Sequence, residues 1–415
     1  MEKTNCRMNR IEEPDVTQIR MFRLHSHHLD REYGKSDLFD IAGACGLQNS
    51  PPGAWETALF NRVPDYSQAD MEELLYRKKT LLQAWSLRGA PVVFPASECD
   101  AFLTALTAKE DEPWIYTRGI SAALDFLQMD FEELFLLLKQ VISRLDGNVI
   151  TSKSDLDQTL AGWMAPYLPG EKRVLWNRPS MYGEPDRQTV GGAVVSFLLR
   201  PCAFEGLVVF GERDGATPTF TSRINWLGKT ETAVENGTGE SGASNGAAGK
   251  LVRKFLHCYG PATANMFAVW LGCSGKQARR MWKTVSEEME AVTVSGKKAF
   301  ILSCDRDKFL SPAPLQRELL LLGGHDPYLD QRDRLVLQPD RTLHSRIWKL
   351  VTNPGAVVYR GEVSGVWTGK KSSKGMEIKV SLWRDFPGRK KLAGLAEAYA
   401  AFRGQELSGL ELEIL

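Results

Sequence analysis

The sequence has no surplus of either charge. It contains 52 Lys and Arg against 51 Asp and Glu, and its formal net charge is +1. A strongly basic chain is attracted to nucleic acid over its whole surface, and this composition excludes that kind of binding. Any affinity for nucleic acid must therefore come from local groups of cations.

Paired cysteines are also absent. The seven cysteines are odd in number and scattered, with no Cys-x-x-Cys pair. Disulfide frameworks and zinc sites place cysteines at short, regular spacings, so we expect reduced thiols, a cytoplasmic location and no bound cofactor. Three histidines do cluster in Leu24-His25-Ser26-His27-His28. No second group of ligands stands at metal-binding spacing from them, so we expect surface or linker histidines and no metal site.

Long apolar runs are missing as well. No run approaches the roughly 18 apolar residues of a membrane-spanning helix, and Met1 to Arg10 lack the apolar core of a signal peptide. The composition, 43% hydrophobic and 25% charged over 415 residues, is that of a chain with several globular domains. We expect neither export nor membrane insertion, and a monomer.

What the sequence does contain is an order of elements that occurs three times: two or three helical patterns and then an extended pair, as in a winged helix. The third copy is the clearest. Helices are predicted over 248–259 and from Pro261 to Leu271, and Ser274 is a suitable N-cap for a third helix that runs to about Met289. Two strand-like runs, 291–294 and 298–302, then flank a short wing at 295–297.

The first copy has the same order and the second is looser. In the first, helices are predicted over 37–45, 55–61 and from Ser67 to Arg77, with Asp70 completing a capping box, and strands over 81–87 and 91–94. In the second, helices are predicted over 131–145 and 152–164, and strands over 193–199 and 207–210.

The last part of the chain changes character. Residues 230–249 are rich in Gly, Ser, Thr, Asn and Glu, as in a flexible linker. Beyond residue 313, strands are predicted over 334–337, 356–359, 362–367 and 376–382, followed by a helix over 390–402. The chain is thus predicted to be α+β, with a tail (1–19), winged helices (20–115 and 116–228), a flexible linker or loop (229–249), a third winged helix (250–312) and a small C-terminal β-barrel with a closing helix (313–415).

Two groups of cations are candidates for DNA contacts. In the predicted third helix of the third copy, an i, i+3, i+4, i+7 spacing places four on one face: Lys276, Arg279, Arg280 and Lys283. A second group lies at the tip of a predicted hairpin: Lys370, Lys371 and Lys374. Either group is read as a set of phosphate contacts or as an ordinary solvated surface.

Five short motifs together resemble the AlkZ/YcaQ-type family of DNA glycosylases, whose members are also described as winged helix DNA-binding domain-containing proteins. The motifs, in the family's order, are Gly46-Leu47-Gln48, Trp85-Ser86-Leu87-Arg88-Gly89, Tyr259-Gly260-Pro261-Ala262-Thr263, Gly324-His325-Asp326-Pro327-Tyr328 with Gln331-Arg332-Asp333-Arg334, and Gly365-Val366-Trp367. The resemblance covers the chain from about residue 20 onward. It implies three winged helices and a C-terminal β-barrel around a channel for double-stranded, damaged DNA.

The resemblance also implies a catalytic pair, which this chain matches in half. Such glycosylases are expected to hold the attacking water with Gln-x-Gln or Gln-x-Asp. Here the pair is Gln48 and Ser50, and Asn49 between them is a candidate DNA contact. The family's Thr and His after Arg-Gly are also missing from Arg88-Gly89-Ala90-Pro91-Val92. If the match of this segment to the family's motif is shifted by one or two residues, Asn49 or Glu56 would join the site.

A reduced pair still suits some substrates. A purine alkylated at a ring nitrogen is cationic and leaves readily, so the protein needs only to extrude it and orient a water. Two readings therefore remain: a glycosylase for bulky or cationic alkylated purines (N7 or N3 adducts) and crosslinks, which we favour, or a DNA-binding lesion sensor or regulator without chemistry. Arg88 is read as a DNA contact or a buried structural partner, and Asp326 and Asp333 as partners in internal ion pairs.

Overall fold

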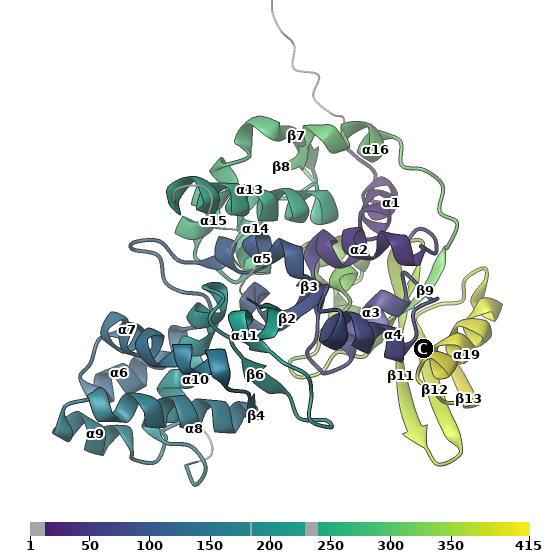
Figure 1. The fold of residues 1–415 in the computed structure, drawn as a ribbon. Coiled ribbons are helices and arrows are strands. Elements are labelled where there is room, and N and C mark those ends of the chain that lie inside the picture. The colour runs from purple at the N-terminus through teal and green to yellow at the C-terminus, as the bar shows by residue number, and fades with distance from the viewer. Residues whose placement is uncertain (1–12, 183–184, 229–239) are drawn as a thin grey trace, which may run out of the picture.

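The protein is a mixed α and β molecule. The computed structural model describes residues 13–182, 185–228 and 240–415, and these form helices and four sheets (Figure 1). These helices and sheets confirm the predicted α+β class. Within the described ranges, no helix has both the length and the apolar character that crossing a membrane requires.

The N-terminal region places a small sheet beside four helices, drawn in purple to blue near the centre of Figure 1. Ser67 and Asp70 form the predicted capping box. The sheet has the strand order β1-β3-β2, and all its pairings are antiparallel. The elements are α1 (Val16–Ser26), α2 (Leu38–Cys45), β1 (Leu47–Gln48), α3 (Ala54–Phe60), α4 (Gln68–Glu72), β2 (Leu81–Trp85) and β3 (Pro91–Pro95).

The next region is mainly helical, and its helices α6 to α10 form the blue to teal lobe at the lower left of Figure 1. The strand predicted over 193–199 is wrong, because Val190–Phe204 is helix α10, in which 12 residues are buried. An apolar run buried on all sides shows no alternation that separates a strand from a helix. The elements are α5 (Cys99–Phe102), α6 (Ser121–Leu127), α7 (Phe131–Ile142), β4 (Ile150–Thr151), α8 (Lys153–Met164), α9 (Gly170–Trp176), α10, β5 (Val209–Phe210), β6 (Thr219–Thr221) and α11 (Arg223–Leu227).

The third region consists of three helices and a hairpin, green at the top of Figure 1. The helix α13 begins at Glu240, so residues 240–249 of the predicted linker are helical, while 229–239 lie outside the described residues. Ser274 caps α15 as predicted, but α15 ends at Lys283, and α14 begins after Thr263 instead of at Pro261. The elements are α13 (Glu240–Tyr259), α14 (Ala264–Leu271), α15 (Gly275–Lys283), β7 (Met289–Val294) and β8 (Lys297–Leu302).

The C-terminal region is an open five-stranded sheet, with the order β13-β12-β11-β10-β9. The edge strands β9 and β13 do not pair with each other, so the sheet stays open and the predicted closed barrel is wrong. The strand predicted over 334–337 is the short helix α17, and β9 and β13 were not predicted. The elements are α16 (Arg306–Leu310), β9 (Leu319–Leu322), α17 (Arg334–Leu337), α18 (His344–Ile347), β10 (Gly355–Tyr359), β11 (Glu362–Ser372), β12 (Gly375–Leu382), α19 (Leu392–Phe402) and β13 (Leu407–Ile414).

The regions are packed into one another. A single apolar cluster joins Cys45 and Phe102 from the first two regions with Tyr259 and Trp270 from the third. The first and third regions therefore share a core.

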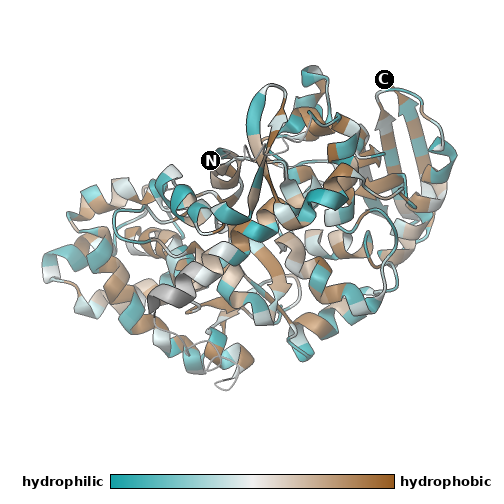
Figure 2. Cartoon of the chain, turned by 90° about the horizontal axis from the view of Figure 1, so that it is seen from above, coloured by the Kyte–Doolittle hydropathy of each residue, from teal (hydrophilic) through white to brown (hydrophobic). Residues whose placement is uncertain are grey.

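Along β12, buried and exposed residues alternate, which produces the teal and brown bands on the strands near the C-terminus in Figure 2.

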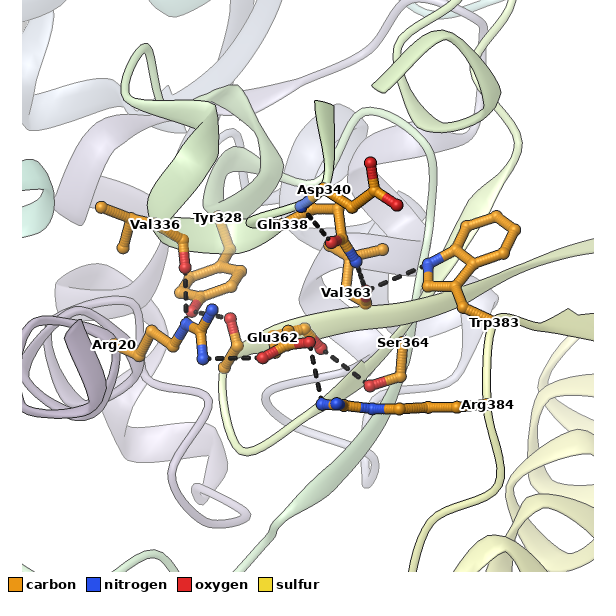
Figure 3. A network of polar contacts seen from close by, with 11 residues as sticks. Arg20, Tyr328, Val336, Gln338, Asp340, Glu362, Val363, Ser364, Trp383 and Arg384 are labelled. Atoms are coloured by element: carbon orange, nitrogen blue, oxygen red, sulfur yellow. Dashed lines mark hydrogen bonds and ion pairs between the residues drawn. The ribbon is translucent and has the colours of Figure 1, made fainter. Parts of the chain in front are cut away.

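A polar network ties the N-terminal helix to the C-terminal sheet (Figure 3). The guanidinium of Arg20 donates to the carbonyl of Val336 at 2.5 Å and to Glu362 at 2.9 Å. Glu362 also accepts from Arg384.

Residues 1–12 of the predicted tail lie outside the described residues, but Val16–Ile19 belong to α1, so the tail is shorter than predicted. The count of three winged helices stays a prediction.

Candidate functional site

Gln48 lies on the short strand β1, directly after α2. The chain passes from helix to strand at Gly46, which has a φ of 71°. A Cβ at this glycine would lie 2.6 Å from the side chain of Val92. A side chain at Gly46 would therefore displace the strand that carries Gln48.

The carboxamide of Gln48 is held from three sides. Its Nε2 donates to the carbonyl of Ser50 at 3.0 Å and lies 3.2 Å from Nδ1 of His325. Its Oε1 accepts from Arg88 at 3.1 Å. An amide oxygen has two lone pairs, so Oε1 can still accept a hydrogen bond from a water molecule.

Arg88 connects Gln48 to a carboxylate. Its Nη1 lies 2.8 Å from Asp330 and donates to the carbonyl of Trp270 at 2.6 Å. Asp330 is also paired with Arg332 at 2.7 Å. Arg88 thus makes three contacts within the protein, which favour the structural one of its two predicted roles.

A small cavity lies among these side chains. Its volume is about 20 Å³, which is close to the minimum of roughly 10–15 Å³ that one water molecule requires. Four of the residues that line it belong to the network just described: Gln48, Arg88, His325 and Asp330. The arrangement can hold a single water against an amide oxygen and a carboxylate.

His325 is the side chain that the sequence motifs did not assign to the site. Burial lowers the pKa of His325 below its ordinary value, against the opposite influence of Asp330. A neutral imidazole with Nδ1 as acceptor matches the amide N–H of Gln48. The family's histidine is missing after Arg88-Gly89, and His325 supplies an imidazole from a distant part of the chain. The only signal for His325 in the sequence was the family motif that contains it.

Ser50 and Asn49 do not line the small cavity. Ser50 is exposed, and it meets Gln48 through its backbone carbonyl. Asn49 is buried and bonds to Gln83 and to the backbone N–H of Gly53. Glu56 pairs with Arg403, so a shift of register does not bring a carboxylate to Gln48. The carboxylate in this cavity comes from Asp330.

Larger cavities adjoin the same residues. His325 also lines a cavity of about 330 Å³, together with Pro51, Asn353 and Trp367. Arg88 also lines another cavity, of about 520 Å³. Pockets for small molecules measure about 300–1,000 Å³. Both cavities are large enough for a small organic group beside the Gln48 site.

The predicted ion pairs around this site are formed, with partners from elsewhere in the chain. Asp326 accepts two hydrogen bonds from Arg62, at 2.8 and 3.0 Å, and both side chains are buried. Asp333 pairs with Arg23 at 2.8 Å. The two pairs, of which the first is fully buried, fix the segment on which His325 and Asp330 lie.

The predicted basic face of α15 is only partly free. Arg280 makes two hydrogen bonds to the buried carboxylate of Glu112, and Lys276 lies 3.5 Å from Asp111. Arg279 and Lys283 are exposed. The second predicted group is exposed as a whole: Lys370 and Lys371 at the end of β11, and Lys374 in the turn to β12.

One cluster in the described residues could hold a metal ion. His27, Cys45 and Cys258 are buried, and their ligand atoms lie within 4.8 Å of one another. The pKa of Cys45 is held well below its ordinary value, mainly by a hydrogen bond from Cys258. His27 is thus a core residue, contrary to the predicted surface or linker role. Sequence spacing could not show the cluster, because its members lie far apart along the chain.

Comparison with known proteins identifies the family. The model of the family described as DNA glycosylase AlkZ-like matches residues 41–403. The chain therefore belongs to the AlkZ-like family of DNA glycosylases. It is also similar to the interstrand DNA cross-link repair glycosylase of Streptomyces sahachiroi, with 25% identity over 362 residues, 84% of this chain and 86% of that protein.

The fold agrees with a solved structure. The Streptomyces sahachiroi DNA glycosylase AlkZ superposes with a TM-score of 0.74 at 22% identity, over 97% of this chain and all of that one. At this identity the likeness establishes the fold alone.

Proposed function

We propose that the protein flips alkylated purines out of duplex DNA and hydrolyses their N-glycosyl bonds with a water held by Gln48. The observation that carries this proposal is the fixed carboxamide of Gln48 beside a cavity for one water molecule. A glycosylase that acts on a good leaving group needs an oriented water more than a strong base.

In the proposed reaction, the water oxygen bonds to the anomeric carbon of the nucleotide. The bond from that carbon to the base breaks, and the cationic base takes the electron pair and leaves neutral. Oε1 of Gln48 accepts one hydrogen bond from the water, and the carboxylate of Asp330 accepts the other. As the new bond forms, the water gives one proton to the carboxylate of Asp330, whose partly exposed side chain passes it on to solvent. Asp330 supplies the carboxylate that position 50 lacks.

The proposed substrates are bulky N7 and N3 adducts, and interstrand crosslinks. The relative from Streptomyces sahachiroi is named for the repair of such crosslinks. The cavities of about 330 and 520 Å³ that share His325 and Arg88 with the site offer space for an extruded base that carries an adduct.

The test is the release of free base from duplex oligonucleotides that carry N7-alkylguanine adducts of increasing bulk, under single-turnover conditions. Gln48→Ala is expected to lower the rate about 100- to 1,000-fold, because an oriented hydrogen-bond acceptor is lost. Asp330→Asn is expected to lower it about 100-fold. Gln140→Ala, an exposed glutamine on α7, is the matched control and should retain the full rate.

The competing reading predicts a different result. A DNA-binding protein without chemistry would bind the same duplexes in a salt-dependent manner and release no base from any of them. Equal rates of base release for wild type and Gln48→Ala would show a glycosylase in which Gln48 has no catalytic role.

A further inference from the structure

Two adjacent aliphatic side chains are fully exposed on the loop between α18 and β10. Leu350 has a relative exposure of 106% and Val351 of 91%, higher than any other large apolar residue in the described ranges. Single exposed apolar side chains are common on protein surfaces. Two adjacent, fully exposed side chains on one loop both lack the hydrophobic free energy that burial would contribute, and such a pair indicates a binding surface.

The loop that carries this pair is fixed at both ends. Before the pair, Ile347 is buried, and the indole of Trp348 donates to the carbonyl of Leu329 at 3.0 Å. After it, Asn353 accepts from the backbone N–H of Lys349 at 2.8 Å and donates to the carbonyl of Gly324 at 3.2 Å. The exposed tip therefore projects from a tethered base.

That tether leads to the proposed site. Gly324 precedes His325, whose Nδ1 lies 3.2 Å from the carboxamide of Gln48. Asn353 and His325 line the same cavity of about 330 Å³. The loop is thus connected by two hydrogen bonds and one peptide bond to the group that we propose to orient the water.

The surroundings of the pair suit a polyanion. Residues 341–361 contain Arg341, Arg346, Lys349 and Arg360 and no Asp or Glu. Arg360 is paired with Glu318, whereas Arg341 and Lys349 are exposed. Cations at the edge of an apolar tip are the combination with which proteins hold phosphates while an aliphatic side chain enters the base stack.

We propose that Leu350 and Val351 insert into the duplex at the lesion and fill the space that the extruded base leaves. This inference rests on the proposed function and adds the part that stabilises the open duplex. A flipped base leaves a gap in the stack, and a branched aliphatic side chain in that gap opposes its return.

The experiment compares the double variant Leu350→Ser/Val351→Ser with Leu136→Ser/Val174→Ser, a control that changes two aliphatic residues of 57% and 61% exposure elsewhere. Base release is measured from an adduct in duplex DNA and in the same single strand. The loop variant is expected to lose at least about tenfold on the duplex and nothing on the single strand, which has no stack to refill. An unchanged duplex rate, or an equal loss on both substrates, would overturn the proposal.

A second readout does not depend on chemistry. 2-Aminopurine next to the lesion in duplex DNA reports unstacking by a rise in fluorescence on binding, and Gln48→Ala is used because it slows base release. The rise is expected with Gln48→Ala and not when the loop substitutions are added; a rise in both refutes insertion. If the wild type releases no base from any substrate, the proposed function fails, and this fluorescence comparison still decides the role of the loop.

Discussion

Nδ1 of His325 lies 3.2 Å from Nε2 of Gln48, although 277 positions separate the two residues. The contact joins the strand after α2 to the segment between β9 and α17. It fixes the direction of the Gln48 carboxamide, because the imidazole accepts from the N–H side and Arg88 donates to the oxygen side. The candidate site therefore depends on contacts between distant regions.

The role of Arg88 is tested by Arg88→Lys. Lysine keeps the charge, but it cannot bond at once to Gln48, Asp330 and the carbonyl of Trp270. We expect the rate of base release to fall about tenfold or more and the salt dependence of DNA binding to stay unchanged. A smaller salt slope with an unchanged rate would instead assign Arg88 to a phosphate contact.

The acidity of His325 predicts a pH dependence. Its pKa lies below the ordinary value because of burial, so the neutral form that accepts from Gln48 persists below pH 6.5. The rate should be flat above neutrality and fall as the pH drops through the lowered pKa, where protonation removes the acceptor. In His325→Asn this acid limb should disappear, since asparagine keeps an acceptor and does not titrate. Measured pH–rate profiles of the two proteins check this, and an acid limb that persists in the variant contradicts it.

The buried pair of Arg62 and Asp326 is expected to matter for stability. Arg62→Met leaves Asp326 as an unpaired buried carboxylate and should lower the free energy of unfolding by about 3–5 kcal/mol. The double variant Arg62→Met/Asp326→Leu removes both charges and should recover much of that loss. Urea unfolding of the three proteins measures both effects, and a double variant no more stable than Arg62→Met would be the contrary result.

The cations of α15 are expected to behave differently from one another. Arg279 and Lys283 are exposed, so Ala at either position should lower the slope of log K against log salt by about 0.9 if one phosphate contact is lost. Arg280→Ala should leave the slope unchanged and reduce stability, because Glu112 is buried against Arg280. Binding titrations at several salt concentrations separate the two classes, and the Lys370, Lys371 and Lys374 group can be compared in the same way.

Local signals in the sequence predicted many elements correctly. Ser67 and Ser274 cap their helices because a hydroxyl at that position satisfies a free backbone N–H of the first turn. The strand pairs β2–β3 and β7–β8 follow from short apolar runs on either side of turn residues. The strand predicted over 193–199 failed because its apolar run is buried on all sides of α10.

By itself, the sequence determined the α+β class, the helix caps and most helices, because each depends on neighbours along the chain. Only the tertiary structure decided that the C-terminal sheet stays open and that His325 and Arg88 hold the carboxamide. It also decided that Asp330, and not position 50, brings a carboxylate to the cavity. These contacts join residues far apart in sequence, and no local propensity specifies which distant side chains a packed core brings together.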